Sequence, residues 1–332
     1  MLRITFKAVG QGDSILIEWA DNQGFMHIGI IDCNLVNGGR SPVLEYIKQS
    51  GYRKIEFLVL SHPHSDHFSG FFSLLEYCES EAIQLGVFYH SCHAVPDYLK
   101  AASQSITSSR EAFNLFHKIL QLYKEEKMDK KILDQTEYPI LELSNMLKIK
   151  CLSPSERERD SYISNKKYYY NEEADGNNPK ANLLSSILKI YCEEEDWYVL
   201  LTADADASTF LRLDKKHKSE FEGELILAQC PHHGSRLNCK RVFWKNKKKA
   251  TKCYVAFSVG ENKYGHPNQW TKDTFIENGF LLRFTTDMSK LNRSETSETA
   301  SRLLSSFSQP VSFESDLAFE IQRGGAVREI MQ

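Results

Sequence analysis

The chain has 332 residues, of which 41% are hydrophobic and 26% are charged, and this composition excludes disordered and fibrous proteins. Forty-one basic against forty-four acidic residues give a formal net charge of −3, so bulk charge does not favour general coating of nucleic acid. No apolar run approaches the roughly 18 residues that a membrane-spanning helix needs, and the first residues alternate like a strand and not like a signal peptide. We therefore expect a cytoplasmic protein without membrane contact.

The first part of the chain predicts strands separated by turns. Polar and apolar residues alternate over 3–9, 14–19 and 26–32, and Gly-containing turns lie between these runs. A helix is predicted over 42–50, and the apolar run FLVL (57–60) predicts a further strand. This order indicates a β-rich layer followed by a helix and another strand.

The middle of the chain predicts helices around one strand. Residues 66–80 have a helical pattern, 83–90 a strand pattern, and 97–126 the pattern of one or two amphipathic helices. We expect a helical insertion over about 94–145 and a polar surface excursion over about 155–180.

A second strand-rich half follows. Its predicted strands lie within 146–154, 185–192, 196–204, 224–235, 252–260, 280–287 and 316–322. A helix is predicted from Gln269 to Glu277, and a Ser/Thr-rich excursion over about 289–310. Two strand-rich halves flanked by helices predict one α/β domain over 1–332 with stacked α, β, β and α layers.

The eight cysteines form no C-x-x-C pair, and most lie in apolar, strand-like segments. Thiols in such segments are usually buried and reduced. We therefore expect neither disulfide bonds nor a zinc finger built on cysteine.

The strongest chemical signal is S-H-P-H-S-D-H at 61–67, directly after the predicted strand that ends at Leu60. Its candidate metal ligands are His62, His64, Asp66 and His67. Imidazole and carboxylate groups suit Zn²⁺, Mn²⁺ and iron, and a turning loop can direct its first two histidines to one ion and the following Asp-His pair to a second. The alternative is a polar surface loop with incidental histidines.

Two further groups of candidate ligands follow predicted strands. Asp204 comes after YVLLTA, and His232 and His233 come after LILAQCP. Ligands converge at strand ends in layered α/β proteins. Alone, Asp204 would be interpreted as a turn former and each histidine as a packing residue, but with the first motif they supply a site for two ions about 3.5 to 4 Å apart.

Taken in order, these segments resemble the metallo-β-lactamase superfamily, and within it the metallo-hydrolase domain of ComEC-type competence proteins and their free-standing relatives. The matching blocks are VGQGDSILI (9–17), IIDCN (30–34), HPHSDHFSG (62–70), LSP (152–154), NLLSSIL (182–188), LLTAD (200–204), PHHGS (231–235), SVGENKYGHP (258–267) and FTTD (284–287). The resemblance implies an αββα sandwich of the α/β (α+β) class with its metal site at the edge of the two β-sheets. One departure is Ala203, where the family usually has glycine.

The ligands divide between two ions in this interpretation. We assign His62, His64 and Asp204 to one ion, and Asp66, His67, Asp204 and either His232 or His233 to the other. Many superfamily members have one more histidine for the first ion, for which His90 and His93 are the candidates here, the alternative being a polar loop. Zinc is the expected metal, with manganese or iron as alternatives.

Other residues are predicted to support the site. Asp66 and His266 are the catalytic candidates; His266 would contact a substrate phosphate or protonate a leaving group, unless it only precedes a helix beside Pro267. Asp32 is expected to orient a ligand histidine, and Asp13 to support the region through hydrogen bonds within its turn.

A basic stretch, KRVFWKNKKKATK (240–252), follows the PHHGS block and predicts a local contact with phosphates near the metal edge, with Phe243 and Trp244 available to stack on bases. The predicted substrate-binding residues are Lys245, Lys247, Lys248, Lys249 and Asn182. The alternative for the lysines is a solvated face.

The predicted activity is hydrolysis by a metal-bound hydroxide, with a phosphodiesterase or nuclease acting on nucleic acid or a nucleotide as the first hypothesis. The second hypothesis is a hydrolase of a small ester, lactone or amide. The third is a catalytically silent, metal-binding component of a bacterial assembly, such as a defence system.

Overall fold

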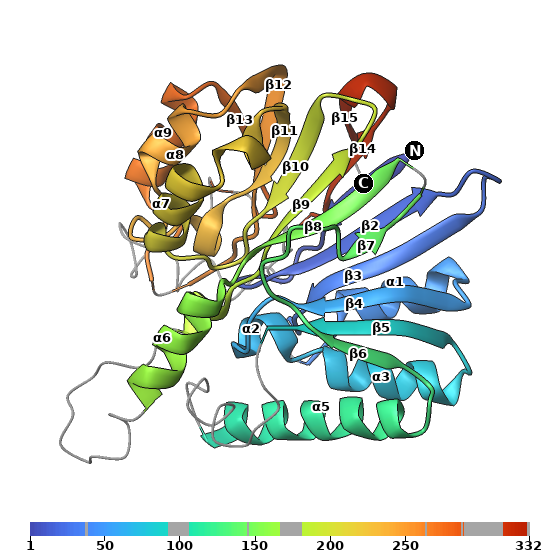
Figure 1. Ribbon diagram of the computed structural model, residues 1–332. Coiled ribbons are helices and arrows are strands. Elements are labelled where there is room, and N and C mark those ends of the chain that lie inside the picture. Colours follow the sequence, from blue (N-terminus) through green and yellow to red (C-terminus); the bar gives the residue numbers. More distant parts are fainter. Residues whose placement is uncertain are drawn as a thin grey trace, which may run out of the picture.

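Two mixed β-sheets lie face to face in the computed structural model, with helices on the outer face of each sheet (Figure 1). The structure describes residues 1–36, 39–91, 106–144, 146–166, 181–262, 264–286, 288 and 315–330. The strand orders are β15-β14-β1-β2-β3-β4-β5-β6 in the first sheet and β13-β12-β11-β10-β9-β8-β7 in the second. The predicted αββα layering is therefore confirmed.

The first sheet combines both ends of the chain. Its strands are β1 (Leu2–Phe6), β2 (Ser14–Ala20), β3 (Met26–Cys33), β4 (Lys54–Leu60), β5 (Gln84–His90), β6 (Asp129–Ile132), β14 (Leu317–Ile321) and β15 (Val327–Ile330). The strands of the second sheet are β7 (Leu141–Glu142), β8 (Leu147–Ser153), β9 (Ile187–Cys192), β10 (Trp197–Leu201), β11 (Glu224–Gln229), β12 (Lys249–Phe257) and β13 (Phe280–Phe284).

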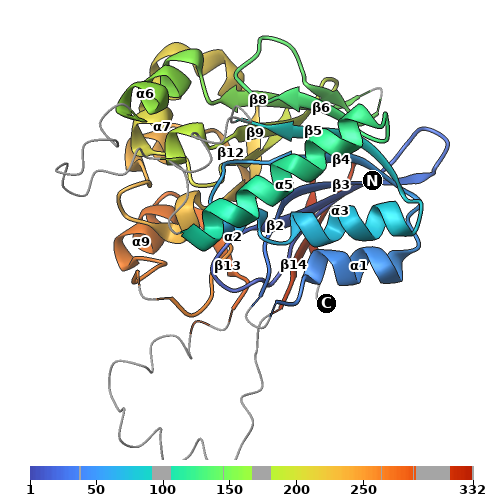
Figure 2. The ribbon, with the colours of Figure 1, turned by 90° about the horizontal axis from the view of Figure 1, so that it is seen from below.

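Helices cover the two outer faces. The α-helices are α1 (Pro42–Ser50), α2 (Ser65–Phe68), α3 (Phe71–Ser80), α5 (Ile106–Lys124), α6 (Glu156–Lys166), α7 (Ala207–Lys216), α8 (Arg241–Lys245) and α9 (Gln269–Glu277). Short 3₁₀ turns are η2 (Ala181–Leu184), η3 (Lys218–Phe221), η4 (Pro231–Gly234) and η5 (Arg323–Gly325). Figure 2 shows α1, α3 and α5 together on one flank of the molecule, with α9 on the other.

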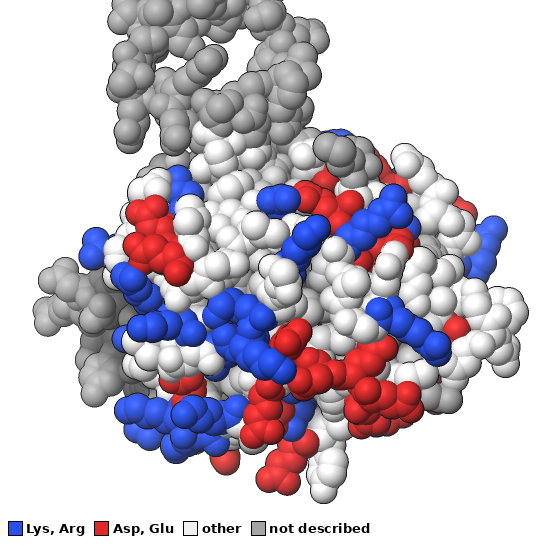
Figure 3. Space-filling view, turned by 90° about the horizontal axis from the view of Figure 1, so that it is seen from above, with Lys and Arg blue, Asp and Glu red and all other residues white. Residues whose placement is uncertain are grey.

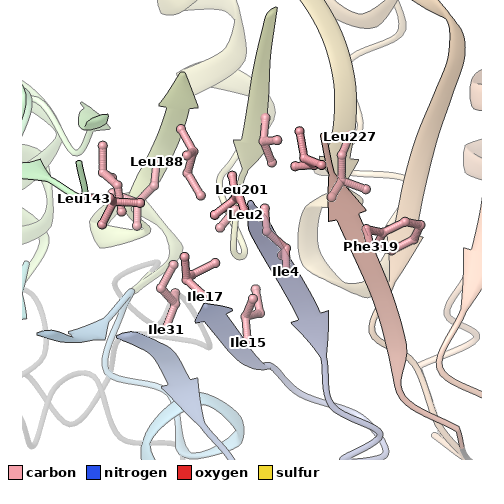
Figure 4. Close-up of a cluster of buried hydrophobic side chains, with 14 of the residues drawn as sticks. Leu2, Ile4, Ile15, Ile17, Ile31, Leu143, Leu188, Leu201, Leu227 and Phe319 are labelled. Atoms are coloured by element: carbon pink, nitrogen blue, oxygen red, sulfur yellow. The ribbon is translucent and has the colours of Figure 1, made fainter. Parts of the chain in front are cut away.

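Three apolar layers hold the sandwich together. Along β4, Phe57 and Val59 point between the sheets, whereas Leu58 and Leu60 point toward the helices, because successive side chains of a strand face opposite ways. Figure 4 shows the middle layer, where side chains of the first sheet, such as Ile17, and of the second sheet, such as Leu188, belong to one apolar cluster. Burial of both faces explains why FLVL is a continuous apolar run.

Parallel strands bring the chemical groups to one edge. In the first sheet β3, β4 and β5 run parallel, and in the second sheet β10, β11, β12 and β13 do so. Parallel strands end at the same edge of a sheet, so the loops after β4, β10 and β11 can converge. These loops carry the histidines and aspartates singled out in the sequence.

The helix predicted over 66–80 is divided into α2 and α3 in the structure. The division lies at Gly70, whose backbone N–H donates to the carbonyl oxygen of Cys33 over 2.7 Å. A β-carbon at Gly70 would lie 2.8 Å from the sulfur of Cys33, so only glycine permits this close approach of the loop to β3.

The segments predicted as insertions are only partly described. Within 94–145 the structure has α5 and also β6 and β7, which extend the first and second sheet respectively. Within 155–180 it has α6, and the excursion predicted over 289–310 lies outside the described residues. No helix among the described residues has the length and apolar character needed to cross a membrane.

The cysteines of the described part are free thiols, and all of them are buried. Burial raises the pKa of several of them, for example that of Cys33 to about 12 and that of Cys253 to about 12. They therefore act as apolar packing groups, while Cys92 lies outside the described residues.

We predict that Phe57→Ala lowers the free energy of unfolding by about 3 to 5 kcal/mol, because it leaves a cavity between the sheets. The Phe57 ring lies over Gly29 and stacks on Trp19 with ring centroids 5.8 Å apart. Chemical denaturation of wild type and variant measures the effect. The matched control is Phe25→Ala, since Phe25 is 63% exposed, and an equal loss in both variants would contradict the packing described.

Candidate metal centre

The S-H-P-H-S-D-H loop joins β4 to α2 and places its histidines at the sheet edge. His62 and His67 are fully buried, while His64 and Asp66 are half-buried. Nε2 of His62 lies 3.0 Å from Nδ1 of His64, so these two rings point toward one position. The loop thus presents two histidines on one side and an Asp-His pair on the other.

Asp32, at the end of β3, holds this loop in place. Its carboxylate accepts hydrogen bonds from the backbone N–H of Ser61 over 2.8 Å and from the Ser61 hydroxyl over 2.6 Å. Its Oδ2 also lies 2.7 Å from Nδ1 of His67. When Nδ1 of His67 donates to Asp32, Nε2 presents its lone pair to the candidate metal site, which is how a carboxylate partner orients a ligand histidine.

Asp204 lies between two sets of histidines. One carboxylate oxygen, Oδ1, is 3.6 Å from Nε2 of His67 and 3.4 Å from Nε2 of His233. The other, Oδ2, is 3.6 Å from Nε2 of His62 and 3.4 Å from Nε2 of His232. A carboxylate whose two oxygens face different ligand sets has the position of a group that bridges two ions.

The backbone that carries Asp204 is fixed by Gln229, the last residue of β11. The side-chain oxygen of Gln229 accepts from the backbone N–H groups of Thr202 and Ala203, each over 2.9 Å. Ala203 has a φ of 43°, which is unusual for a residue other than glycine. Sequence reasoning missed Gln229, although a glutamine within the apolar run LILAQC was a signal.

The adjacent histidines of η4 point to different parts of the site. His233 is buried, and its Nδ1 lies 2.9 Å from the carbonyl oxygen of Ser258, while its Nε2 lies 3.6 Å from Oδ2 of Asp66. His232 is 28% exposed in its side chain, and its Nδ1 lies 3.1 Å from the amide nitrogen of Asn182. His233 therefore lies with Asp66 and His67, whereas His232 lies on the side of His62.

Two groups of side chains within the described residues are spaced to hold a cation. One is made of His62, His64 and Asp204, and the other of Asp13, His67, Asp204 and His233, with one donor atom of each residue within 4.8 Å of the others. Several of these donor atoms are buried without a hydrogen-bond partner: both carboxylate oxygens of Asp13, Nε2 of His67, Oδ1 of Asp204 and Nε2 of His233. Buried polar atoms normally have partners, so this donor set fits a divalent cation.

The electrostatics keep the carboxylate of Asp204 in its ligand form. Burial acts to raise the pKa of Asp204, but His232, His233 and His67 hold it well below its ordinary value. Burial acts to lower the pKa of His233, but Asp204 and Asp66 raise it to about 9. A cation that binds here displaces such protons, so metal binding should release protons.

His266 lies beside the cluster without joining either group. Its ring centroid is 5.5 Å from that of His232, and its backbone is held by Asn262, whose side chain bonds both its N–H over 3.1 Å and its carbonyl over 2.8 Å. Nδ1 of His266 is buried without a hydrogen-bond partner. Burial lowers the pKa of His266 to about 4, so its imidazole is neutral at pH 7.

The structure places His90 away from both groups. It is the last residue of β5, it is buried, and its ring centroid lies 5.2 Å from that of Phe116 in α5. The suggestion that His90 completes the first metal site is therefore wrong, because its side chain faces the helical layer. His93 lies outside the described residues.

The expectation that Asp13 acts through hydrogen bonds of its turn is only half correct. Its backbone N–H donates to the carbonyl oxygen of Asp66 over 3.1 Å. Its carboxylate makes no hydrogen bond and faces the second group of candidate ligands instead. Asn182, predicted to contact substrate, has its amide against His232, so its contact is with a candidate ligand.

The expectation that the basic stretch lies near the metal edge is wrong. Lys249 pairs with Leu225 at the start of β11, whereas η4 follows the end of that strand, which spans about 20 Å. Lys248 pairs with Asp196 over 2.9 Å, and the face of the molecule in Figure 3 carries basic and acidic groups against one another. The cause is topological, because the segment between η4 and β12, which includes α8, returns the chain to the opposite edge of the sheet.

The members of this stretch also differ in exposure. Lys247 is buried, with Nζ 3.9 Å from the ring centroid of Phe243, and Phe243 and Trp244 are themselves core residues. Lys249 is half-buried and donates to the carbonyl oxygen of Lys247 over 2.7 Å. Of the four lysines predicted to bind substrate, the other two, Lys245 and Lys248, are exposed. The two aromatic rings therefore cannot stack on bases.

No protein-family model and no curated protein matches the sequence. Solved structures that overlay on it include a diphosphatase from the PhnP family, with 11% identity and a TM-score of 0.41 over 84% of this chain and 94% of that chain. The metallo-β-lactamase fold protein YhfI from Bacillus subtilis gives 11% identity and a TM-score of 0.44 over 85% of this chain and 96% of that chain. The short form of human tRNase Z gives 12% identity and a TM-score of 0.41 over 85% of this chain and 92% of that chain.

At these identities and TM-scores, nothing about the activity of this chain follows from the overlays. The class of protein follows from the molecule itself: two stacked sheets with outer helices, and an H-x-H-x-D-H loop that meets an aspartate and a histidine at the sheet edge. The two stacked sheets with outer helices thus have the αββα architecture that the resemblance to the metallo-β-lactamase superfamily implied.

We predict that Asp32→Asn weakens metal binding by about 10- to 100-fold, because His67 loses the carboxylate that orients it. Asparagine tolerates the left-handed conformation that Asp32 adopts, with a φ of 58°, so the backbone should not change. Competition with a chromophoric chelator measures the affinity, and circular dichroism checks the fold. Wild-type affinity in a folded variant would show that Asp32 does not orient His67.

Proposed function

We propose that this chain is a hydrolase with two divalent cations, that it cleaves phosphodiester bonds, and that it is a free-standing relative of the ComEC-type metallo-hydrolase domain. The observation that carries the proposal is Asp204, whose two oxygens face two separate sets of imidazoles. Paired cations that share a carboxylate suit displacement at phosphorus, where both the attacking and the leaving oxygen need charge neutralised.

The bound cations would lower the pKa of a coordinated water and polarise the phosphoryl oxygens. The residues of the chain hold these cations and shape the approach to them. Asp13, His62, His67, Asp204 and His233 are buried, whereas His64, Asp66, His232, Asn182 and His266 are half-buried. A substrate therefore reaches the site over the half-buried set, which defines its open side.

His266 would bind the substrate on this open side. Because its imidazole is neutral at pH 7, it can donate an N–H to a phosphoryl oxygen, whereas an acid that protonates a leaving group would need a higher pKa. The low pKa thus favours the first of the two roles suggested by the sequence. Its position is fixed by Asn262, whose side-chain amide donates to the carbonyl oxygen of His266 and whose side-chain oxygen accepts from the N–H of His266.

The placement of the lysines bears on the size of the substrate. A long nucleic acid needs a basic track that follows its backbone to the active site. The exposed Lys248 and the half-buried Lys249 lie at the start of β12, at the edge of the sheet opposite η4. This favours a nucleotide-sized phosphodiester over a long polymer, and it removes one argument for a nuclease.

We further propose that the protein functions in the bacterial cytoplasm and that zinc occupies the first position. The free, buried thiols of the described part are typical of a reducing compartment. The first group, His62, His64 and Asp204, has the nitrogen-rich donor set that zinc accepts.

We predict that the metal-loaded protein hydrolyses bis(p-nitrophenyl) phosphate and that His266→Ala lowers its turnover about 100-fold, with the metal content unchanged. The control variant is His217→Ala, which removes a half-buried histidine that contacts Gln135 far from the cluster. Turnover is measured by p-nitrophenolate release and metal content by elemental analysis. Loss of metal in His266→Ala would show that His266 is a ligand and not a substrate contact.

The same preparation separates the competing functions. Cleavage of a small ester or lactone without cleavage of any diester would contradict the phosphodiesterase proposal and support the small-molecule hydrolase. Two bound ions without turnover of any of these substrates would support the catalytically silent alternative.

A further inference from the structure

Asp13 lies where the first turn of the chain meets the S-H-P-H-S-D-H loop. Its backbone N–H donates to the carbonyl oxygen of Asp66, and a β-carbon at the neighbouring Gly12 would lie 2.4 Å from that same oxygen. Gly12 has a φ of 133°, so glycine is required both by the close approach and by the backbone conformation. The turn therefore rests directly on the backbone of Asp66, which places the carboxylate of Asp13 beside the second group.

The carboxylate of Asp13 is buried without a compensating donor. The residue is 1% exposed, and neither of its carboxylate oxygens has a hydrogen-bond partner. The nearest charged partner is Nδ1 of His67, 3.7 Å away, but that atom lies 2.7 Å from Asp32 and serves it instead. A buried carboxylate in this position needs a cation, because it has given up water without gaining hydrogen bonds.

We propose that Asp13 is a direct ligand of the second cation, the one that His67, His233 and Asp204 would hold. Its carboxylate gives this second position a higher ratio of Mn²⁺ to Zn²⁺ affinity than the first position has, which is formed by the first group. The proposal depends on the part of the proposed function that places two cations at this edge. Neither the sequence pattern nor the comparisons assign a ligand to the turn that precedes β2.

The two donor sets differ in chemistry. The second group contains two carboxylates, Asp13 and Asp204, and two imidazoles, His67 and His233. Asp66 adds a third carboxylate, with Oδ2 3.6 Å from Nε2 of His233. The first set contains two imidazoles, His62 and His64, around the shared carboxylate of Asp204, with His232 near by. Zinc is usually held by about four ligands rich in nitrogen or sulfur, whereas Mn²⁺ accepts more oxygen ligands and a higher coordination number. Five donors, three of them carboxylates, therefore suit Mn²⁺ at the second position.

The test is metal binding, independent of activity. Mn²⁺ affinity is measured on the chelator-stripped chain by the electron paramagnetic resonance signal of free Mn²⁺, and Zn²⁺ affinity by competition with a chromophoric chelator. Two Mn²⁺ binding steps are expected for wild type. In Asp13→Asn the affinity of the weaker step, or of both steps, should fall tenfold or more. The Zn²⁺ affinity of the same variant should change less than about threefold. The matched control is Asp32→Asn, which should weaken Mn²⁺ and Zn²⁺ alike at the second position, because His67 is a ligand of that position whichever ion it holds.

Stability of the metal-free chain provides the second readout. Since the carboxylate of Asp13 has no hydrogen bond to lose, the melting temperature of metal-free Asp13→Asn should equal or exceed that of wild type. Asp13→Ser is measured in parallel, because it removes the carboxylate with a smaller side chain. An unchanged ratio of Mn²⁺ to Zn²⁺ affinity in both variants, or loss of the fold in both, would overturn the proposal. If wild type itself binds fewer than two ions, the two-cation site of the proposed function is what fails.

Discussion

The buried carboxylate of Asp204 is the constraint on which the arrangement of this molecule depends. It is almost completely removed from water, and imidazole groups from two separate loops face its two oxygens. A carboxylate in such a place is stable only when positive charge compensates it. The loops after β4 and β11 must therefore meet at Asp204, and this fixes how the two sheets are aligned at their common edge.

The backbone around this carboxylate adopts conformations that only strong local contacts can maintain. Asp32, Ala203, His232 and His233 all have positive φ values, a conformation that is unfavourable for residues with a β-carbon. Contacts with Ser61, Gln229 and Ser258 hold three of these residues in place. Strain of this kind concentrates at functional sites, where the position of a ligand matters more than the stability of the chain.

Much of the fold was predictable because both sheets are buried on both faces, so that strands such as β4 and β10 appear as continuous apolar runs. The core of the site was predictable for a related reason, since His62 and Asp204 directly follow such runs. What could not be predicted depends on contacts between distant segments. The break between α2 and α3 depends on Cys33, and the carboxylate of Asp13 acquires its surroundings only when the turn before β2 packs against the backbone of Asp66.

The basic stretch shows that residues close together in the sequence can lie far apart in the fold. Proximity in sequence to PHHGS suggested proximity to the metal edge, but the segment between η4 and β12 carries the chain along the length of the sheet before β12 begins. Lys247 is then buried over the rings of Phe221 and Phe243. Composition alone cannot distinguish such a lysine from one that contacts phosphate.

The central claim is that one carboxylate unites two cation positions, and counting the ions bound by Asp204→Asn tests it most directly. Elemental analysis of wild type, Asp204→Asn and the exposed control Asp196→Asn, each loaded with excess metal and then desalted, gives ions per chain. The account predicts about two ions in wild type and in the control, and fewer than one in Asp204→Asn, because both positions lose their shared ligand. Two ions retained in a folded Asp204→Asn would contradict it.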